Sequence, residues 1–335
     1  MSGPVYHGGR LDLAIASHGG DRQSWLDLST GINPNAYPIG DITPDAWQRL
    51  PGGDAEALLM EAARSYYNVP KGFGIIAANG TQALIEIVPR LMNCQNIAVL
   101  SPTYAEHEHA WKKAGRHVEC VVGFEQMSFL ANALVVVNPN NPTAKLYSPE
   151  QLLEFSAEMA KRHGYLIVDE AFCDPFPQNS IVPHMTRNML IYRSFGKFFG
   201  LAGLRLGFLI ASHEFIHKAE NLIGPWSVSG PALEIGRRAL MDQKWIEAAT
   251  NQLHDLSAAQ SEMLVQCGLT VECVNPLFIY TKHDSSQVLF DRLLEKQILV
   301  RKFPEMRDRL RFGLCKDQKE IERLRVALAN IMDVL

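Results

Sequence analysis

The sequence predicts an α/β fold built on a mostly parallel sheet. Two apolar runs, 134–137 and 165–168, each end abruptly at polar residues. Strands that are apolar on both sides are typical of a parallel sheet that helices cover on both faces. The segment between them, 149–163, has the spacing of an amphipathic helix and would supply the crossover that parallel strands require. A third apolar run, 189–193, would extend the same sheet.

Composition limits the function classes that need to be considered. The chain has 335 residues, of which 47% are hydrophobic, and its formal net charge is -4. This length and composition predict one or two domains with a large core, and the charge balance argues against nucleic acid as a main partner. No apolar run approaches the ~20 residues of a membrane span, and the N-terminus lacks a signal pattern. We therefore expect a cytoplasmic protein that binds neither membrane nor nucleic acid.

The six cysteines are scattered and form no Cys-x-x-Cys pair. Such spacing favours reduced cysteines over a disulfide framework or a zinc site. His107 and His109 would point to different faces of a helix, so they do not predict a metal site either.

Residues 1–45 are rich in Gly, Pro, Asn and Asp and show little periodicity. They cannot form a domain alone, and two interpretations are open. They could be a mobile arm with turn signals, or an arm that folds over an active site and contacts the substrate. The Gly pair in His7-Gly8-Gly9 permits close approach of the backbone to a ligand.

Lys197 is the first candidate for chemistry. It lies among apolar and small residues in the stretch 194–207, just after the apolar run 189–193. Lost solvation would lower the pKa of its amine, which could then attack a carbonyl and form a Schiff base. Arg205 follows between Gly203 and Gly207, where small residues leave room for an anion. The alternative is an ordinary surface lysine in a loop.

Polar residues also follow the other apolar runs. Gly80-Thr81-Gln82 comes between an apolar run from Phe73 and a helical segment, so the helix N-terminus and the Thr81 hydroxyl could bind an anion. A plain turn with a threonine cap is the alternative. Tyr104 follows the short run 96–100 and could pack at a strand end. Asn141 follows the run 134–137.

Asp169 ends the run 165–168, and an acid at the end of an apolar strand is costly to bury unless it is paired. Glu170, the next residue, is expected to make a structural hydrogen bond.

This ordered set of motifs resembles the fold-type I pyridoxal-phosphate enzymes, the aspartate aminotransferase superfamily. The residues that carry the resemblance are Gly80-Thr81, Asn141, Asp169, Ser194-x-x-Lys197 and Arg205. It implies pyridoxal 5′-phosphate as cofactor and a large domain with a mostly parallel seven-stranded sheet, over residues 46–245. It also implies a small α+β domain, from 1–45 and 246–335, and a homodimer.

The resemblance also implies a role for each matching residue. Lys197 would hold the cofactor covalently and Asp169 would pair with its ring nitrogen. The other cofactor contacts would be Gly80, Thr81, Gln82, Tyr104, Asn141, Ser194 and Arg205. Three positions depart from the usual pattern: Gly196 stands where Ser or Thr is usual, Ala144 where Gly is usual, and Phe172 where many members have Tyr.

Within the superfamily the sequence is similar to the threonine-phosphate decarboxylases of cobalamin biosynthesis. The similar stretches are His7-Gly-Gly, 29–34, 169–172, 225–228, Arg301 and Arg311. The implied substrate is L-threonine O-3-phosphate, a small phosphorylated amino acid, and the implied product is (R)-1-amino-2-propanol O-phosphate. The implied substrate contacts are His7, Gly8, Gly31, Asn141, Arg301 and Arg311.

Several alternatives stay open at this stage. The chain could be an aminotransferase of the histidinol-phosphate type, which shares the scaffold, or a non-catalytic protein of the same fold. Arg301 and Arg311 could instead belong to a solvated basic run. Leu50 stands where some relatives have a Tyr that reaches the neighbouring subunit's cofactor phosphate, so that contact would have to be compensated.

Overall fold

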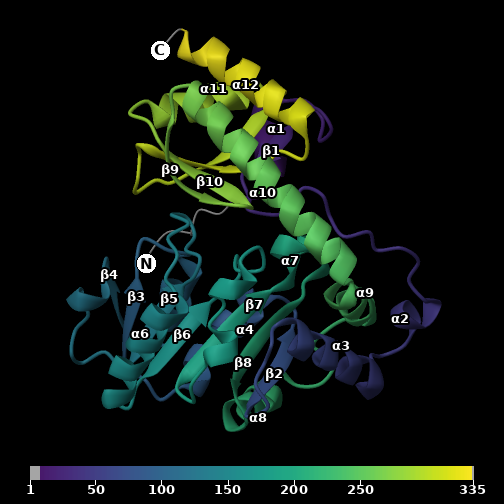
Figure 1. The fold of residues 1–335 in the computed structure, drawn as a ribbon, viewed down its shortest axis with the longest axis vertical. Helices are drawn as coiled ribbons and strands as arrows, with labels where there is room; N and C mark the ends of the chain where they lie inside the picture. The colour runs from purple at the N-terminus through teal and green to yellow at the C-terminus, as the bar shows by residue number, and fades with distance from the viewer. Residues whose placement is uncertain (1–7, 334–335) are drawn as a thin grey trace. The chain divides into compact units, whose positions relative to one another are not determined.

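The computed structural model describes residues 8–333 and divides the chain into two compact units (Figure 1). The large unit comprises Ala36–Asn141 and Lys145–Ile246, and the small unit comprises the residues up to Asn35, Pro142–Ala144 and the residues from Glu247 onward. In the part of the chain that the structure describes, none of the helices combines the length and apolar character needed to cross a bilayer. The predicted His7 contact lies outside the described residues.

The large unit is organised around a seven-stranded sheet in the order β2-β8-β7-β6-β5-β3-β4. All neighbouring pairs are parallel except those of β8, which runs antiparallel to both β2 and β7. The predicted α/β fold with a mostly parallel seven-stranded sheet is therefore confirmed. The strands are β2 (Phe73–Ala78), β3 (Asn96–Leu100), β4 (His117–Val121), β5 (Ala133–Val137), β6 (Tyr165–Asp169), β7 (Met189–Ser194) and β8 (Gly207–Ser212).

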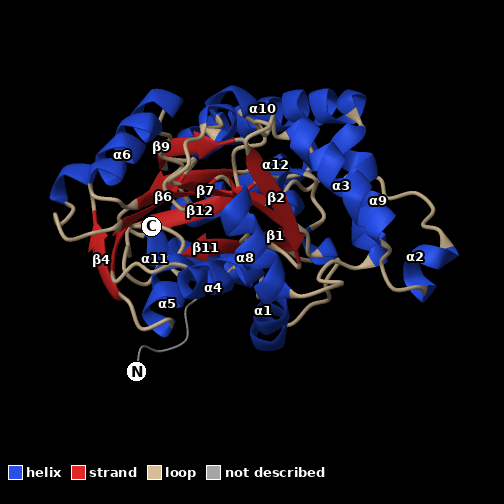
Figure 2. Cartoon of the chain, turned by 90° about the horizontal axis from the view of Figure 1, so that it is seen from below, coloured by secondary structure: helices blue, strands red, loops and turns tan. Residues whose placement is uncertain are grey.

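Helices cover the central strands because those strands are apolar on both sides. Figure 2 shows α4 (Thr81–Leu91), α5 (Glu106–Lys113) and α8 (His213–Ile223) together on one side of the strands. Alternate residues of the strands, such as Leu190 and Tyr192 of β7, join these three helices in one core cluster. The remaining helices of the large unit are α2 (Pro44–Gln48), α3 (Gly53–Tyr66), α6 (Pro149–Lys161), α7 (Phe195–Phe198) and α9 (Gly230–Met241).

The small unit contains a five-stranded sheet in the order β1-β11-β12-β10-β9. β1 (Leu26–Leu28) pairs in parallel with β11 (Ile298–Lys302), and the other pairs are antiparallel. Its other strands are β9 (Thr270–Asn275), β10 (Phe278–Lys282) and β12 (Arg309–Gly313), and its helices are α1 (Leu11–His18), α11 (Ser286–Glu295) and α12 (Gln318–Met332). The long helix α10 (Gln243–Gln266) contains the boundary between the two units.

Residues 1–45 show little periodicity in the sequence, yet they contribute two regular segments to the small unit. Residues 11–18 form the helix α1, and residues 26–28 form β1, an edge strand of the small unit's sheet. The register pairs Leu26 with Ile298, so the partner of this strand is far away in sequence. A three-residue strand leaves almost no local period, and only its distant partner reveals it.

Candidate active site

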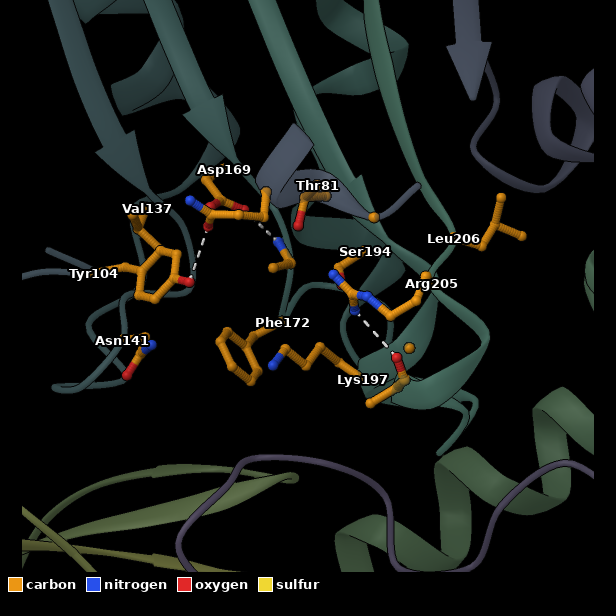
Figure 3. Close-up of a pocket in the computed structure, with 15 residues that line it drawn as sticks. Thr81, Tyr104, Val137, Asn141, Asp169, Phe172, Ser194, Lys197, Arg205 and Leu206 are labelled. Atoms are coloured by element: carbon orange, nitrogen blue, oxygen red, sulfur yellow. Dashed lines mark hydrogen bonds between the residues drawn. The ribbon is translucent and has the colours of Figure 1, made fainter. Parts of the chain in front are cut away.

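The large unit contains a pocket at the carboxyl ends of β5, β6 and β7 (Figure 3). Ligand sites in α/β sheets form at such strand ends because the following loops diverge there. The pocket is lined by Gly80, Thr81, Gln82, Tyr104, Val137, Asn141, Asp169, Ala171, Phe172, Ser194, Gly196, Lys197, Ala202, Arg205 and Leu206. All nine residues predicted to bind a cofactor are among them. Their individual roles stay predictions that substitutions can test.

Lys197 lies on the short helix α7, directly after β7. The side chain is half-buried, and its neighbours Phe195, Phe198 and Phe199 are fully buried. These aromatic rings pack against one another and fix the helix that carries the lysine. The Nζ atom extends over the ring of Phe172, 5.5 Å from its centroid (Figure 3). Lys197 is therefore a pocket amine on a rigid support rather than a surface lysine in a loop.

Asp169 is the last residue of β6 and is only 3% exposed. Its Oδ2 atom lies 2.8 Å from Nε2 of His107, and the backbone N–H of Ala171 donates to Oδ1 over 3.0 Å. His107 lies on α5 and is 1% exposed. These two hydrogen bonds fix the orientation of the buried Asp169 carboxylate, which is a suitable partner for the ring nitrogen of a bound pyridine.

His107 is a site residue that the sequence analysis missed, because it considered this side chain only as half of a metal pair with His109. The buried residues of α5 are His107, Ala110 and Trp111, which have the i, i+3, i+4 spacing of one helix face. That spacing was a signal that His107 points into the core. A buried imidazole requires a polar partner, and Asp169 is that partner.

Two glycines leave room for an anion between the start of α4 and the start of β8. Gly80 precedes α4 with a φ of 80°, and a Cβ atom there would lie 2.5 Å from an Arg205 guanidinium nitrogen. A Cβ atom on Gly207 would lie 2.4 Å from the backbone nitrogen of Thr81. Close backbone approach, N–H groups at a helix N-terminus and a guanidinium suit a phosphate group. Ser194, at the end of β7, adds a hydroxyl to the same pocket.

Tyr104 and Gln82 are held by a chain of hydrogen bonds. The Tyr104 hydroxyl donates to Oε1 of Gln82 over 3.1 Å, and Nε2 of Gln82 donates to Oε2 of Glu106 over 2.9 Å. Gln82 thereby fixes the direction of the Tyr104 ring. The result is an oriented aromatic side chain in a pocket that also contains Lys197 and Asp169.

The pocket fits pyridoxal 5′-phosphate in each of its chemical groups. Lys197 offers an amine for the aldehyde, and the residues around Gly80 offer partners for the phosphate. The buried Asp169 offers a carboxylate for the ring nitrogen, and Tyr104 offers an aromatic face. These partners lie on separate elements of the large unit but line one cavity. Within the described residues, no group of three or more His, Cys, Asp or Glu side chains could bind a metal ion.

The predicted substrate residues are divided between the two units. Asn141 lines the pocket of the large unit, whereas Gly8, Gly31, Arg301 and Arg311 belong to the small unit. In the small unit, Arg301 and Arg311 are register partners on the neighbouring strands β11 and β12. Two cations on adjacent strands form a natural partner for an anion.

Arg311 is buried, and its environment favours an anionic ligand. The guanidinium donates to the backbone oxygen of Ser29 over 3.1 Å and lies 4.9 Å from the centroid of the Phe278 ring. Burial and the nearby Arg301 lower the pKa of Arg311 to about 9. An anion bound beside this pair would relieve both the lost solvation and the mutual repulsion.

Gly8 packs closely against the same segment of the small unit. A Cβ atom on Gly8 would lie 2.3 Å from the backbone oxygen of Ser29, and the N–H of Gly9 donates to Oγ of Ser29 over 2.8 Å. Gly31 is buried two residues after Ser29. The structure therefore brings Gly8 and Arg311 together around Ser29.

Gly196 shows why the usual hydroxyl residue is missing before the lysine. A Cβ atom there would lie 2.7 Å from Cα of Ala202, which is a backbone contact that cannot swing away. We expect Gly196→Ser to destabilise the protein by about 1–3 kcal/mol, as overpacking does, and to weaken cofactor binding. Thermal unfolding and equilibrium dialysis with pyridoxal phosphate measure the two effects.

The matched control for this change is Gly203→Ser. A Cβ atom on Gly203 would have no atom within 4 Å, so this variant should retain both stability and cofactor affinity. Equal behaviour of the two variants would contradict the packing explanation.

The chain is similar to known proteins in sequence and in fold. The chain is 38% identical to a threonine-phosphate decarboxylase from Sinorhizobium sp over 335 residues, covering 99% of both chains. It is also 38% identical to a threonine-phosphate decarboxylase from Pseudomonas aeruginosa over 330 residues, covering 98% of both. The solved histidinol-phosphate aminotransferase from Sinorhizobium meliloti, in complex with pyridoxal-5′-phosphate, matches with a TM-score of 0.84 at 18% identity, over 99% of this chain and 96% of that one.

A match to a family of known enzymes covers most of the chain. It extends over residues 46–328 and includes the whole pocket described above. The chain therefore belongs to the aminotransferase class I and II family.

Proposed function

We propose that this protein is a pyridoxal-phosphate-dependent decarboxylase that converts L-threonine O-3-phosphate to (R)-1-amino-2-propanol O-phosphate and CO₂. The observation that carries the proposal is the 38% identity, over almost the full length, to proteins named threonine-phosphate decarboxylase. We also propose that it works in the cytoplasm, in cobalamin biosynthesis.

Pyridoxal 5′-phosphate is the cofactor, and when bound it accepts the electron pair that remains on the substrate Cα after a bond to it breaks. The residues of the chain create the conditions for this chemistry. Asp169 would hold a proton on the ring nitrogen, and His107 keeps the Asp169 carboxylate oriented. Gly80, Thr81 and Arg205, which line the pocket, would hold the phosphate.

Decarboxylation requires one proton to replace the departing CO₂ on Cα. Lys197 carries the pocket amine, and its Nζ atom can hold a proton and donate it to Cα. Phe172 presents an apolar ring to this amine, which limits hydration around it. Lys197 would thus anchor the cofactor covalently until the substrate amine takes its place, and the released Nζ would then donate the proton.

The substrate carries two anionic groups, a carboxylate and a phosphate. We assign them to Arg301 and Arg311, since the guanidinium fork forms bidentate hydrogen bonds with both group types. The sequence similarity to threonine-phosphate decarboxylases implies the same two arginines as substrate contacts. His7, Gly8, Gly31 and Asn141 complete the proposed set of substrate contacts.

An aminotransferase of the histidinol-phosphate type is the second candidate, because it shares this fold. The structure favours the decarboxylase through Phe172, which lines the pocket without the hydroxyl that many family members place there. A non-catalytic role is disfavoured by the assembled set of Lys197, Asp169 and Arg205.

The decisive assay uses the purified protein loaded with pyridoxal phosphate and supplied with L-threonine O-3-phosphate. Stoichiometric release of CO₂ with no need for a keto acid supports the decarboxylase. Conversion of the cofactor to pyridoxamine phosphate without CO₂ identifies an aminotransferase. No reaction with this substrate and no change in the absorption of the bound cofactor would contradict both.

Arg311→Lys tests the proposed substrate contact. A lysine keeps the charge but loses the bidentate fork, so we expect KM for L-threonine O-3-phosphate to rise by roughly 10–100-fold. Arg309→Lys is the matched control on the same strand, because Arg309 already pairs with Glu272 and Asp308. An equal change of KM in both variants would exclude a specific role for Arg311.

We also propose that the protein is a homodimer that uses an apolar surface of the large unit. Trp47, Leu50 and Trp226 are 69%, 67% and 58% exposed. The helices α2 and α9 that adjoin these residues lie close together, since a Cβ atom on Gly230 would lie 2.2 Å from the backbone oxygen of Ala46. Large exposed apolar side chains on neighbouring segments are typical of protein–protein interfaces.

Trp47→Asp tests the dimer. We expect sedimentation of the wild type at twice the chain mass of 37.4 kDa, and a shift toward the single-chain mass in the variant, because a charge opposes burial of this surface. Phe129→Asp is the control, since Phe129 is 80% exposed on a different loop and should leave the dimer intact. A wild type that sediments as a monomer would refute the proposal.

A further inference from the structure

A buried ion network lies beside the pocket and includes none of the residues that line it. Arg193, on β7, pairs with Glu170 through one guanidinium nitrogen and with Asp174 through the other, over 3.1 Å. All three side chains are at most 3% exposed. The guanidinium also lies over the ring of Tyr67, 4.5 Å from its centroid. One planar fork therefore joins two carboxylates inside the large unit.

Residues of the ion network are sequence neighbours of residues that line the pocket. Glu170 directly follows Asp169, and Arg193 directly precedes Ser194. Successive side chains of a strand point to opposite faces of the sheet. Tyr192 packs among α4 and α5, so Arg193 belongs to the opposite face, where it contacts Tyr67. The ion pair between Arg193 and Glu170 thus links the carboxyl ends of β6 and β7 on the face of the sheet opposite to Tyr192.

The two carboxylates also bracket the segment that carries Phe172. Glu170 and Asp174 stand two residues before and two residues after it. Glu170 accepts further hydrogen bonds from Oγ of Ser180, over 2.6 Å, and from the N–H of Ile181, over 2.7 Å. Arg193 therefore fixes both ends of the turn 170–174. The Phe172 ring at its centre is the ring that contacts Lys197.

We propose that Arg193 is a positioning residue for the cofactor site, acting through Glu170 and Asp174 to hold the turn 170–174 and the Asp169 carboxylate against the pocket. The proposal rests on cofactor binding and does not depend on which reaction the holoenzyme catalyses.

Electrostatics supports a geometric role over a purely stabilising one. Burial raises the pKa of Glu170 and of Asp174, while Arg193 acts in the opposite direction on both. Burial alone would lower the pKa of Arg193, but Asp174 and Glu170 raise it well above its usual value. Arg193 therefore stays a cation. Buried ion networks often contribute little net stability, because desolvation offsets the attraction. Their fixed geometry can still orient neighbouring groups.

The test compares Arg193→Lys and Arg193→Gln with wild type. We expect Arg193→Lys to weaken pyridoxal phosphate binding by at least about 10-fold, since small displacements of site groups have large effects. The pH at which the absorption of the bound cofactor changes should shift as well, because the surroundings of Lys197 change. Arg193→Gln should have the larger effect, as it also removes the charge.

Arg116→Lys is the matched control in the same unit. Arg116 also fastens buried backbone, donating to the oxygen atoms of Pro89 and Met92, but it does not line the pocket. We expect it to lower the melting temperature of the cofactor-free protein without changing cofactor affinity or the pH profile. Cofactor affinity within twofold of wild type in folded Arg193→Lys would overturn the proposal, whatever the melting temperature.

Asp174→Asn covers the case in which the Arg193 variants do not fold. It removes the charge of one of the two partners of Arg193 and leaves the Glu170 pair, so a cofactor affinity about 3-fold weaker is expected. An unchanged affinity in folded Asp174→Asn would contradict the proposal equally. If the wild type binds the cofactor normally but does not decarboxylate L-threonine O-3-phosphate, only the proposed reaction is contradicted. The proposal for Arg193 would then still stand.

Discussion

Lys197→Ala is expected to lower kcat for L-threonine O-3-phosphate by about 10⁴-fold or more, because one change removes both the covalent anchor and the proton donor. The cofactor should also become removable by dialysis, since only non-covalent contacts would still hold it. The backbone of α7 should be unaffected, because Phe195 and Phe198 provide its buried contacts. Turnover, cofactor retention and thermal unfolding together measure these effects.

Two comparisons make the Lys197 result specific. Lys218→Ala removes an exposed lysine that pairs with Glu214 on α8, and it should leave turnover unchanged. Added methylamine should restore part of the activity of Lys197→Ala, because a free amine can enter the vacated volume and transfer the proton. Full activity of Lys197→Ala would refute the assignment of this lysine.

Asp169→Asn is expected to lower kcat by roughly 10²–10³-fold, with a smaller change in cofactor affinity. The amide keeps the size of the side chain but cannot hold a proton on the ring nitrogen by charge. The amide can still form a hydrogen bond with His107 through its oxygen or its nitrogen, according to the tautomer of the imidazole. Steady-state kinetics and the absorption of the bound cofactor would show this separation.

Glu214→Gln provides the control for Asp169→Asn, as it makes the same acid-to-amide change on the exposed face of α8. It should have no effect on kcat. If Asp169→Asn has the same kcat as the wild type, the ring nitrogen needs no buried anion as its partner.

Much of the large unit could be predicted because its signals are local. An apolar run of four residues that is followed by a polar one identifies β5 and β6, and the end of each strand places Asn141 and Asp169 near one edge of the sheet. Parallel strands bring their carboxyl ends to the same edge, so order along the chain translates into proximity in space. For this reason the ordered motifs predicted the lining of a single pocket.

The features that could not be predicted depend on partners that are distant in sequence. β4 alternates weakly and lies at the edge of the sheet, and three-residue β1 depends on β11. His107 and the Arg193 network are polar side chains whose role appears only when Asp169, Glu170 and Asp174 are placed beside them. Tertiary packing decides whether a charged side chain is buried, so the local sequence pattern does not predict it.

Ala144 and Gly196 illustrate how a departure from a family pattern acquires a physical explanation. Ala144 has a φ of 55°, in the left-handed region that favours glycine, so the residue that is usual there matches the backbone better. At Gly196, the backbone of Ala202 excludes any larger side chain.

The pairing of β1 with β11 has a consequence for how the chain folds during synthesis. Leu26 contacts Ile298, so the five-stranded sheet cannot be completed until nearly all of the sequence has left the ribosome. The large unit is almost continuous from Ala36 to Ile246 and can form earlier. Long-range strand pairing is slow because loop closure precedes its favourable contacts. The three residues of β1 therefore stay without their strand partner in the nascent chain until β11 has been synthesised.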